Sequence, residues 1–283
     1  MAIAAFARHP HLRRWLVGVL AALVVAAALG LDHTTPAIIT AAALGPAVCF
    51  AALITHLDHR SPRPWLAFLA ALLWGGTVAA LGSLIVNDFA LRLLPQQWVS
   101  TWVAPLFEEA FKGSALIVVL LVWGDAWRGV REGIICGALA GIGFAATENL
   151  GYYVLAMLQG GSTGLARAVY LRGLLEGFNH AAFTATIGAG AGYARARATS
   201  PRGAFAVALG GFALAVAIHL VWNVTLSPRI NEILCNASAP GGACAPAPDF
   251  DDLLLRVPAL IAVFIGPAAI LLALLVWRAE ADG

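Results

Sequence analysis

The sequence has little charge. Only 11% of its 283 residues are Asp, Glu, Lys or Arg, and 61% are hydrophobic, whereas an ordinary soluble domain carries about 25% charged residues. This scarcity excludes a soluble globular protein and indicates a polytopic membrane protein. We therefore expect a lipid bilayer around the chain and no nucleic-acid partner.

Cysteine is also scarce, with four in the whole chain. Cys49 and Cys136 fall inside apolar runs, where they are expected to be small apolar fillers. Cys235 and Cys244 lie in the loop that follows the predicted seventh membrane span. Because a disulfide persists only in an oxidising compartment, this pair is a candidate disulfide if the loop faces outward.

Long apolar runs dominate the rest of the sequence, and a run of about 20 residues crosses the hydrocarbon core of a bilayer. We predict an all-α fold, a single membrane domain over residues 1–283 with about eight transmembrane helices. The predicted spans are Trp15–Leu31, Ala37–Thr55, Trp65–Val86, Thr101–Trp123, Gly133–Leu158, Leu174–Tyr193, Ala204–Leu226 and Val257–Trp277. The first run also resembles a signal peptide, but we keep it as an anchor because the charge pattern is consistent with its retention.

The arginines sort by side of the membrane. Eleven of them fall in the N-terminus, the even-numbered loops and the C-terminus, whereas the odd-numbered loops hold Arg92, Arg167, Arg172, Arg229 and Arg256. Cytoplasmic loops carry the excess of basic residues. Both termini are therefore predicted to be cytoplasmic, which agrees with an even number of spans.

Three charged residues interrupt the fourth predicted span. Glu108, Glu109 and Lys112 lie within the apolar run Thr101–Trp123, although each ionisable side chain deep in a bilayer costs about 2.5 to 3.5 kcal/mol. On a helix Lys112 lies one turn from both glutamates, so that one ammonium can partly neutralise two carboxylates. The group is either a functional site or a structural ion pair between helices.

The fifth and sixth predicted spans also contain polar groups. Glu148 lies beside Asn149 in the fifth span, and His180 lies early in the sixth. Glu176 precedes His180 by four residues, so we expect it on the same helix face, at the water-accessible end of the span.

The seventh predicted span carries His219 and Asn223, which point the same way on a helix because they are four residues apart. The polar groups of the fourth to seventh spans all lie about six to ten residues from the outer end, or about 9 to 15 Å at the helical rise. We therefore predict one pocket, formed by spans four to seven and nearer the outer face.

Two glycine patterns predict close helix packing. Gly133, Gly137 and Gly141 recur every four residues along one face of the fifth span, and the sixth span contains Gly188, Gly190 and Gly192. Small residues at this spacing let two membrane helices approach closely.

Carboxylates, imidazoles and amides can form a hydrolytic site that has no covalent nucleophile. A desolvated carboxylate can act as general base on water, while imidazole and amide donors stabilise the oxyanion. Two histidines and a carboxylate can instead hold Zn²⁺ with an open position for water. The sequence lacks HExxH, so the ligands of any metal would come from separate helices.

Four short motifs resemble those of the PrsW family of intramembrane proteases. The segments are EEAFK at Glu108–Lys112, FAATEN at Phe144–Asn149, NHAAF around His180 and HLVWN at His219–Asn223. They are similar to the family's EExxK, FxxxEN, lone His and HxxxN and cover residues 101–226. The wider group includes CAAX-processing endoproteases, which carry a histidine where this chain has Glu148.

The resemblance implies an endopeptidase of the bacterial plasma (inner) membrane, acting on a membrane-embedded protein substrate such as an anti-sigma factor. It implies Glu108 as general base with Glu109 as its partner, while Lys112 balances their charge. The opposite assignment stays open, because adjacent helical residues point about 100° apart and either glutamate could face the pocket. His180 would be a water or metal ligand, and His219 and Asn223 would supply oxyanion donors. Glu148 would be a ligand or an orienting group, which makes Glu148, His180 and His219 the candidate ligands of Zn²⁺.

Two other functions are compatible with buried acids and histidines. A proton- or cation-coupled transporter would distribute its acidic groups along a path, often in inverted repeats, and we find neither pattern. A non-catalytic scaffold could keep the same fold.

The predicted topology can be tested by cysteine labelling in a variant that lacks the native cysteines. A cysteine at Ser200, in a predicted cytoplasmic loop, should react with an impermeant maleimide only after the cells are permeabilised. The control, Asn236→Cys in the predicted outer loop, should react in intact cells. Labelling of position 200 from outside would overturn the orientation.

Overall fold

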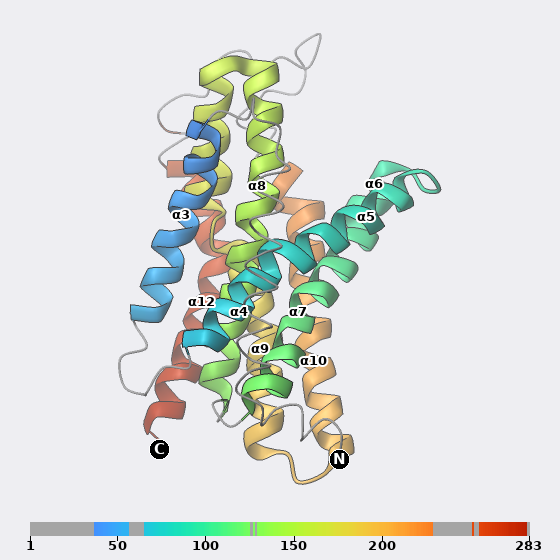
Figure 1. Cartoon of the computed structure of the whole chain (residues 1–283), viewed down its shortest axis with the longest axis vertical. Coiled ribbons are helices and arrows are strands. Elements are labelled where there is room, and N and C mark those ends of the chain that lie inside the picture. Colours follow the sequence, from blue (N-terminus) through green and yellow to red (C-terminus); the bar gives the residue numbers. More distant parts are fainter. Residues whose placement is uncertain are drawn as a thin grey trace.

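The computed structural model describes residues 37–56, 65–124, 127, 129–228, 251 and 255–281. The first predicted span and the Cys235–Cys244 pair lie outside these residues. Every regular element within the described ranges is a helix (Figure 1), which confirms the all-α prediction.

The first half of the described chain forms five α-helices joined in part by π-helical segments (η). They are α3 (Ala37–His56), α4 (Trp65–Trp74), η1 (Gly75–Ala79), α5 (Ala80–Leu91), α6 (Gln96–Trp98), η2 (Val99–Val103) and α7 (Ala104–Trp123). The chain from α5 to η2 makes a helical hairpin that extends to one side of the molecule in Figure 1.

The second half contains the longest helix and its packing partners. The elements are α8 (Val130–Ala168), η4 (Val169–Leu175), α9 (Asn179–Arg197), α10 (Pro201–Val221), η5 (Trp222–Leu226) and α12 (Val257–Ala281). The ribbon of α8 turns back at its upper end in Figure 1. Within α8 the helix is kinked at Gly161, which adopts a φ of 59°. Glycine is the residue that takes this left-handed backbone without strain.

Among the described residues, four helical stretches are long and apolar enough to cross a membrane: Ile38–Thr55, Trp65–Leu91, Val130–Arg197 and Pro201–Leu226. The third of these is a chain of 68 residues that is kinked at Gly161, and it includes both the fifth and the sixth predicted span. The 20-residue α7 carries Glu108, Glu109 and Lys112 in addition to its apolar residues. These helices support a multi-helix membrane protein.

The sixth predicted span is not one continuous helix. The chain breaks at residues 176–178, and α9 begins only at Asn179. The expectation that Glu176 and His180 share one helix face is therefore wrong, because the i, i+4 relation holds only along an unbroken helix. Glu176 ends η4, whereas His180 lies in the first turn of α9.

The glycines of the fifth span allow α8 and α9 to pack at backbone distance, as predicted. A Cβ atom on Gly133, Gly137 or Gly141 would overlap the backbone carbonyls of Gly188, Thr184 and His180, respectively. In α9, Gly188 and Gly192 face α8, whereas Gly190 faces Gly211 of α10. The Gly141 contact matters most for the site, because it lies against the backbone of His180.

A second close contact joins α8 to α4 and η1. A Cβ atom on Gly75 would overlap the Ala140 carbonyl, and one on Gly143 would overlap the Leu72 carbonyl. The Thr147 hydroxyl donates to the Gly76 carbonyl at 2.7 Å. The two contacts hold α8 between α4 and α9.

We expect Gly141→Ala to destabilise the protein, because the added methyl group must displace the His180 backbone. Overpacking of this kind costs about 1 to 3 kcal/mol, and it should lower the unfolding temperature in detergent. The matched control is Gly151→Ala in the same helix, where a Cβ atom meets nothing within 4 Å. Alanine is a better helix former than glycine by about 1 kcal/mol, so the control should be neutral or more stable. Equal unfolding temperatures for the two variants would contradict the packing argument.

Candidate functional site

The polar residues of α7 to α10 surround a cavity of about 320 Å³. The hairpin α5–η2 forms one wall, and the opposite wall comes from α8, η4 and α9. Among the residues that line it are Asn87, Ser100, Glu108, Glu148, Asn149, Tyr152, Arg172, Glu176, Asn179, His180, His219 and Asn223. A cavity with so many polar groups is uncommon inside a membrane helix bundle and marks the candidate site.

Glu109 has no exposed surface. Its Oε1 accepts hydrogen bonds from Lys112 Nζ at 2.5 Å and from His219 Nδ1 at 3.0 Å, while the Thr184 hydroxyl donates to its Oε2 at 3.0 Å. A carboxylate that accepts from an ammonium and a hydroxyl is ionised, so His219 must carry a proton on Nδ1. The other ring nitrogen, Nε2, is then free to face the cavity.

Glu148 and Arg172 form the second charged pair. Arg172 donates to Glu148 Oε2 at 2.6 Å and to Asn149 Oδ1 at 3.0 Å, and its guanidinium stacks 3.6 Å from the ring centroid of Tyr152. The same Glu148 oxygen lies 3.1 Å from His180 Nε2. Arg172 thus holds the carboxylate that orients the His180 ring.

Lys112 joins the two pairs. It is the only lysine in the chain, it is fully buried, and its Nζ lies 3.0 Å from His180 Nδ1. An ammonium can only donate, so Nδ1 of His180 is the acceptor and Nε2 carries the proton given to Glu148. Nζ also lies 4.4 Å from the centroid of the Phe144 ring, at cation–π distance. Both nitrogens of His180 are therefore engaged in this arrangement.

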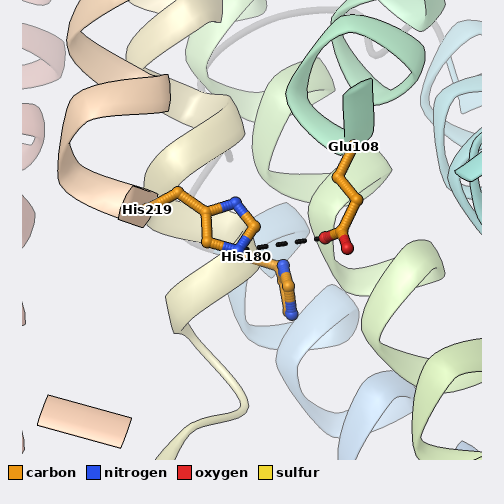
Figure 2. A group of neighbouring side chains, drawn as sticks. All are labelled: Glu108, His180 and His219. Carbon is orange, nitrogen blue, oxygen red and sulfur yellow. Dashed lines mark ion pairs between the residues drawn. The ribbon is translucent and has the colours of Figure 1, made fainter. Parts of the chain in front are cut away.

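Glu108 differs from these residues because its buried Oε2 has no hydrogen-bond partner among the described residues. This oxygen lies 3.8 Å from His219 Nε2 and 3.8 Å from Lys112 Nζ. Figure 2 shows Glu108, His180 and His219 pointing toward one another from α7, α9 and α10. Their candidate ligand atoms all lie within 4.8 Å of one another.

One carboxylate oxygen and two imidazole nitrogens are the donor set that Zn²⁺ takes in catalytic sites. The orphaned oxygen of Glu108 and the free Nε2 of His219 fit such an ion directly. His180 would offer a ring nitrogen that is presently hydrogen-bonded, so Lys112 or Glu148 would have to give way. The donor atoms of these three residues are therefore of the kinds that bind a divalent metal.

The model of the PrsW family intramembrane metalloprotease matches residues 63–239, which is more than half of the chain. The chain belongs to the PrsW family. The match confirms the resemblance and makes the protein an intramembrane protease in general terms. It begins before α4, so the family region is wider than the motif region 101–226. Neither a curated protein nor a solved structure matches the chain.

In this PrsW-family chain the structure brings the predicted residues of α7, α8, α9 and α10 into one cluster. Asn223 also lines the cavity, but it lies in η5, and its Nδ2 donates to the Ser100 carbonyl at 3.0 Å. The residues that could hold a metal in the structure are Glu108, His180 and His219, whereas the sequence predicted Glu148, His180 and His219. Glu148 instead pairs with Arg172, which can orient His180 as a carboxylate behind a ligating histidine does.

Two predictions about neighbouring residues need correction, and a third neighbour had no predicted role. Arg172 was counted among the outer-loop arginines, but it lies in the cavity wall with its side chain 23% exposed. Glu176 was expected at the water-accessible end of a span, yet its carboxylate is 13% exposed and lies 3.8 Å from Arg172. Asn179 was assigned no role, although it lines the cavity next to His180. No sequence pattern marked Arg172, because its place in the cavity wall depends on η4 and on the break at residues 176–178.

The PrsW-family site is positioned in part by π-helical segments. η2, η4 and η5 contribute Ser100, Arg172 and Asn223 to the cavity wall. A π segment inserts an extra residue in a helical turn and redirects the side chains that follow, and such segments are frequent at functional sites. Pro105 follows η2 in the first turn of α7, and it has no N–H to donate to the preceding π-helical turn. Glu108 and Glu109 therefore lie in the first two turns of α7 after the change from π-helix to α-helix.

Proposed function

We propose that this protein hydrolyses a peptide bond in a membrane-embedded protein, using a water molecule that Glu108 activates. The observation that carries the proposal is the pair of free acceptors at the cavity, Glu108 Oε2 and His219 Nε2, which lie 3.8 Å apart. A water molecule between them can donate one hydrogen to each. The bound oxygen then keeps its lone pairs for attack on a carbonyl.

Glu108 suits the role of general base better than Glu109. Glu108 lines the cavity, whereas Glu109 is fully buried and accepts from Lys112, His219 and Thr184. A general base must reach the proton that it removes. We assign Glu109 to holding Lys112 and the His219 tautomer in place.

The two proposed oxyanion donors differ in whether they have a hydrogen available to donate. Asn223 has two amide hydrogens and gives one to Ser100, so the second can serve an oxyanion. Neutral His219 has no hydrogen on Nε2, since its proton bonds to Glu109. We therefore propose that His219 either holds a metal through Nε2 or accepts a proton there. It donates to an oxyanion only in the second case, as imidazolium.

The charge of the site favours a divalent cation. Lys112 and Arg172 are its two basic side chains, and they face four carboxylates, those of Glu108, Glu109, Glu148 and Glu176. We propose that Glu108, His180 and His219 hold Zn²⁺ in the active protein. Glu108 would then offer one carboxylate oxygen to the ion and keep the other to accept the proton of the water. Bound Zn²⁺ would lower the pKa of its water and polarise the substrate carbonyl.

The proposed substrate is a protein that crosses the membrane, and an anti-sigma factor is the class that the PrsW resemblance implies. The wall formed by α5 to η2 presents apolar side chains such as Phe89, Leu91 and Trp98 on its exposed surface. Such a wall suits contact with lipid and with an apolar substrate segment. Eight spans with both termini in the cytoplasm of a bacterial cell complete the proposal.

Coupled transport is the less suitable alternative. The carboxylates of Glu108, Glu109 and Glu148 gather around one cavity, which suits reaction at a single point. A proton path would need acidic groups at successive depths.

We expect Glu108→Gln to abolish cleavage of a single-span reporter while leaving thermal stability unchanged, because no hydrogen bond to its Oε2 is lost. Loss of a general base lowers the rate by about 10² to 10⁴. Glu109→Gln should instead lower stability, since three donors converge on that carboxylate. The control is Asp88→Asn, which alters an exposed ion pair with Arg92 and should behave as wild type. Wild-type cleavage by Glu108→Gln would refute the proposed base.

We expect purified protein to contain about one Zn²⁺ per chain, and cleavage to stop when a chelator removes it. His219→Ala should lose the metal, whereas Glu148→Gln should retain it with reduced affinity, because Glu148 contacts His180 without joining the ligand group. Elemental analysis of the variants measures both. Full activity of metal-free protein would leave water activated by Glu108 alone as the mechanism.

A further inference from the structure

Asn179 is the first residue of α9 and the neighbour of His180 in the cavity wall. Its side chain is 3% exposed, yet neither its Nδ2 nor its Oδ1 has a hydrogen-bond partner among the described residues. A buried polar atom left in this state costs about 1 to 3 kcal/mol. Asn179 is thus expected to destabilise the folded protein when no ligand is bound.

Two other asparagines of the cavity wall are already engaged. Asn149 uses both of its amide atoms with Arg172, and Asn223 donates to Ser100. The charged groups bond mainly to one another, as the Lys112–Glu109 and Arg172–Glu148 pairs show. Asn179 therefore offers a neutral donor and a neutral acceptor side by side, both available to a ligand.

A carboxamide of this kind matches the backbone of an extended peptide. Each peptide group has one N–H donor and one carbonyl acceptor, and inside a membrane these groups must be paired. A transmembrane segment that unwinds for cleavage loses its helical hydrogen bonds and exposes such groups. The amide of Asn179 can replace one donor and one acceptor at once.

We propose that Asn179 binds a backbone peptide group of the substrate beside the scissile bond. The inference rests on the proposed function and names what the site recognises: an unwound transmembrane segment, bound through its backbone and independently of its side chains. Its position next to His180 puts the bound peptide group within the same cavity as Glu108 and His219.

A structural role for Asn179, such as holding an internal water molecule, predicts a different result. Asn179→Ala would then remove hydrogen bonds of the folded protein and lower its unfolding temperature. If Asn179 is reserved for substrate, Asn179→Ala should leave the unfolding temperature unchanged or raise it. The matched control is Asn149→Ala, which removes a similarly buried asparagine that is bonded in the free protein and should lower it.

The decisive experiment uses a synthetic leucine-rich single-span peptide with a central Gly-Ser pair, in detergent micelles. One backbone amide at a time is replaced by an ester, which removes a single N–H donor. For wild type we expect one ester position near the cleavage point to lower kcat/KM by about 10-fold, the effect of one lost hydrogen bond. Asn179→Ala should show that loss with the all-amide peptide and no further loss with the ester.

Binding measured in the Glu108→Gln background separates this inference from the proposed function. There the Asn179→Ala change should weaken binding of the all-amide peptide and remove the ester effect on affinity, whether or not the protein cleaves. Absence of cleavage by wild type would refute the proposed protease mechanism and leave the binding result as the test of Asn179. Equal ester sensitivity with and without Asn179 at every position, or a loss of stability like that of Asn149→Ala, would overturn the inference.

Discussion

The bond between Lys112 and Glu109 is the interaction on which the site depends. Both side chains are fully buried, and Nζ lies 2.5 Å from the carboxylate. Removing one partner of a buried pair costs about 3 to 5 kcal/mol, because the other charge remains without compensation. The same ammonium contacts His180 of α9 and Phe144 of α8. One cation therefore ties three helices together and sets the tautomer of His180.

Much of the packing could be predicted from the sequence, because small residues and apolar runs act through spacing along a helix. The four-residue spacing of Gly133, Gly137 and Gly141 predicted the close approach that the structure shows against α9. That approach places Glu148 of α8 within 3.1 Å of His180. The family and the helical class were also predictable, since four ordered motifs and long apolar runs require no tertiary information.

The details that sequence reasoning missed arise where helices stop being regular. Periodicity arguments assume 3.6 residues per turn, but η4 and the break at residues 176–178 alter the direction of every side chain between Arg172 and His180. Arg172 was predicted in a loop, but it lies in η4 and lines the cavity. The choice between Glu108 and Glu109 was also beyond the sequence, because only the helices opposite determine which carboxylate faces Thr184 and which faces the cavity.

The polar residues of the site fall into two sets that alternate along the chain. Glu109 and His180 have their acceptors and donors filled by other side chains, whereas their immediate neighbours Glu108 and Asn179 keep unpaired atoms at the cavity. Adjacent residues on a helix point about 100° apart, so each neighbouring pair places one side chain in the buried network and the other at the cavity. The network fixes the backbone on both sides of the reactive group without using its hydrogen-bonding capacity. A single turn of helix can thus hold a buried charge that is compensated by its partners and, beside it, an acceptor that is free for chemistry.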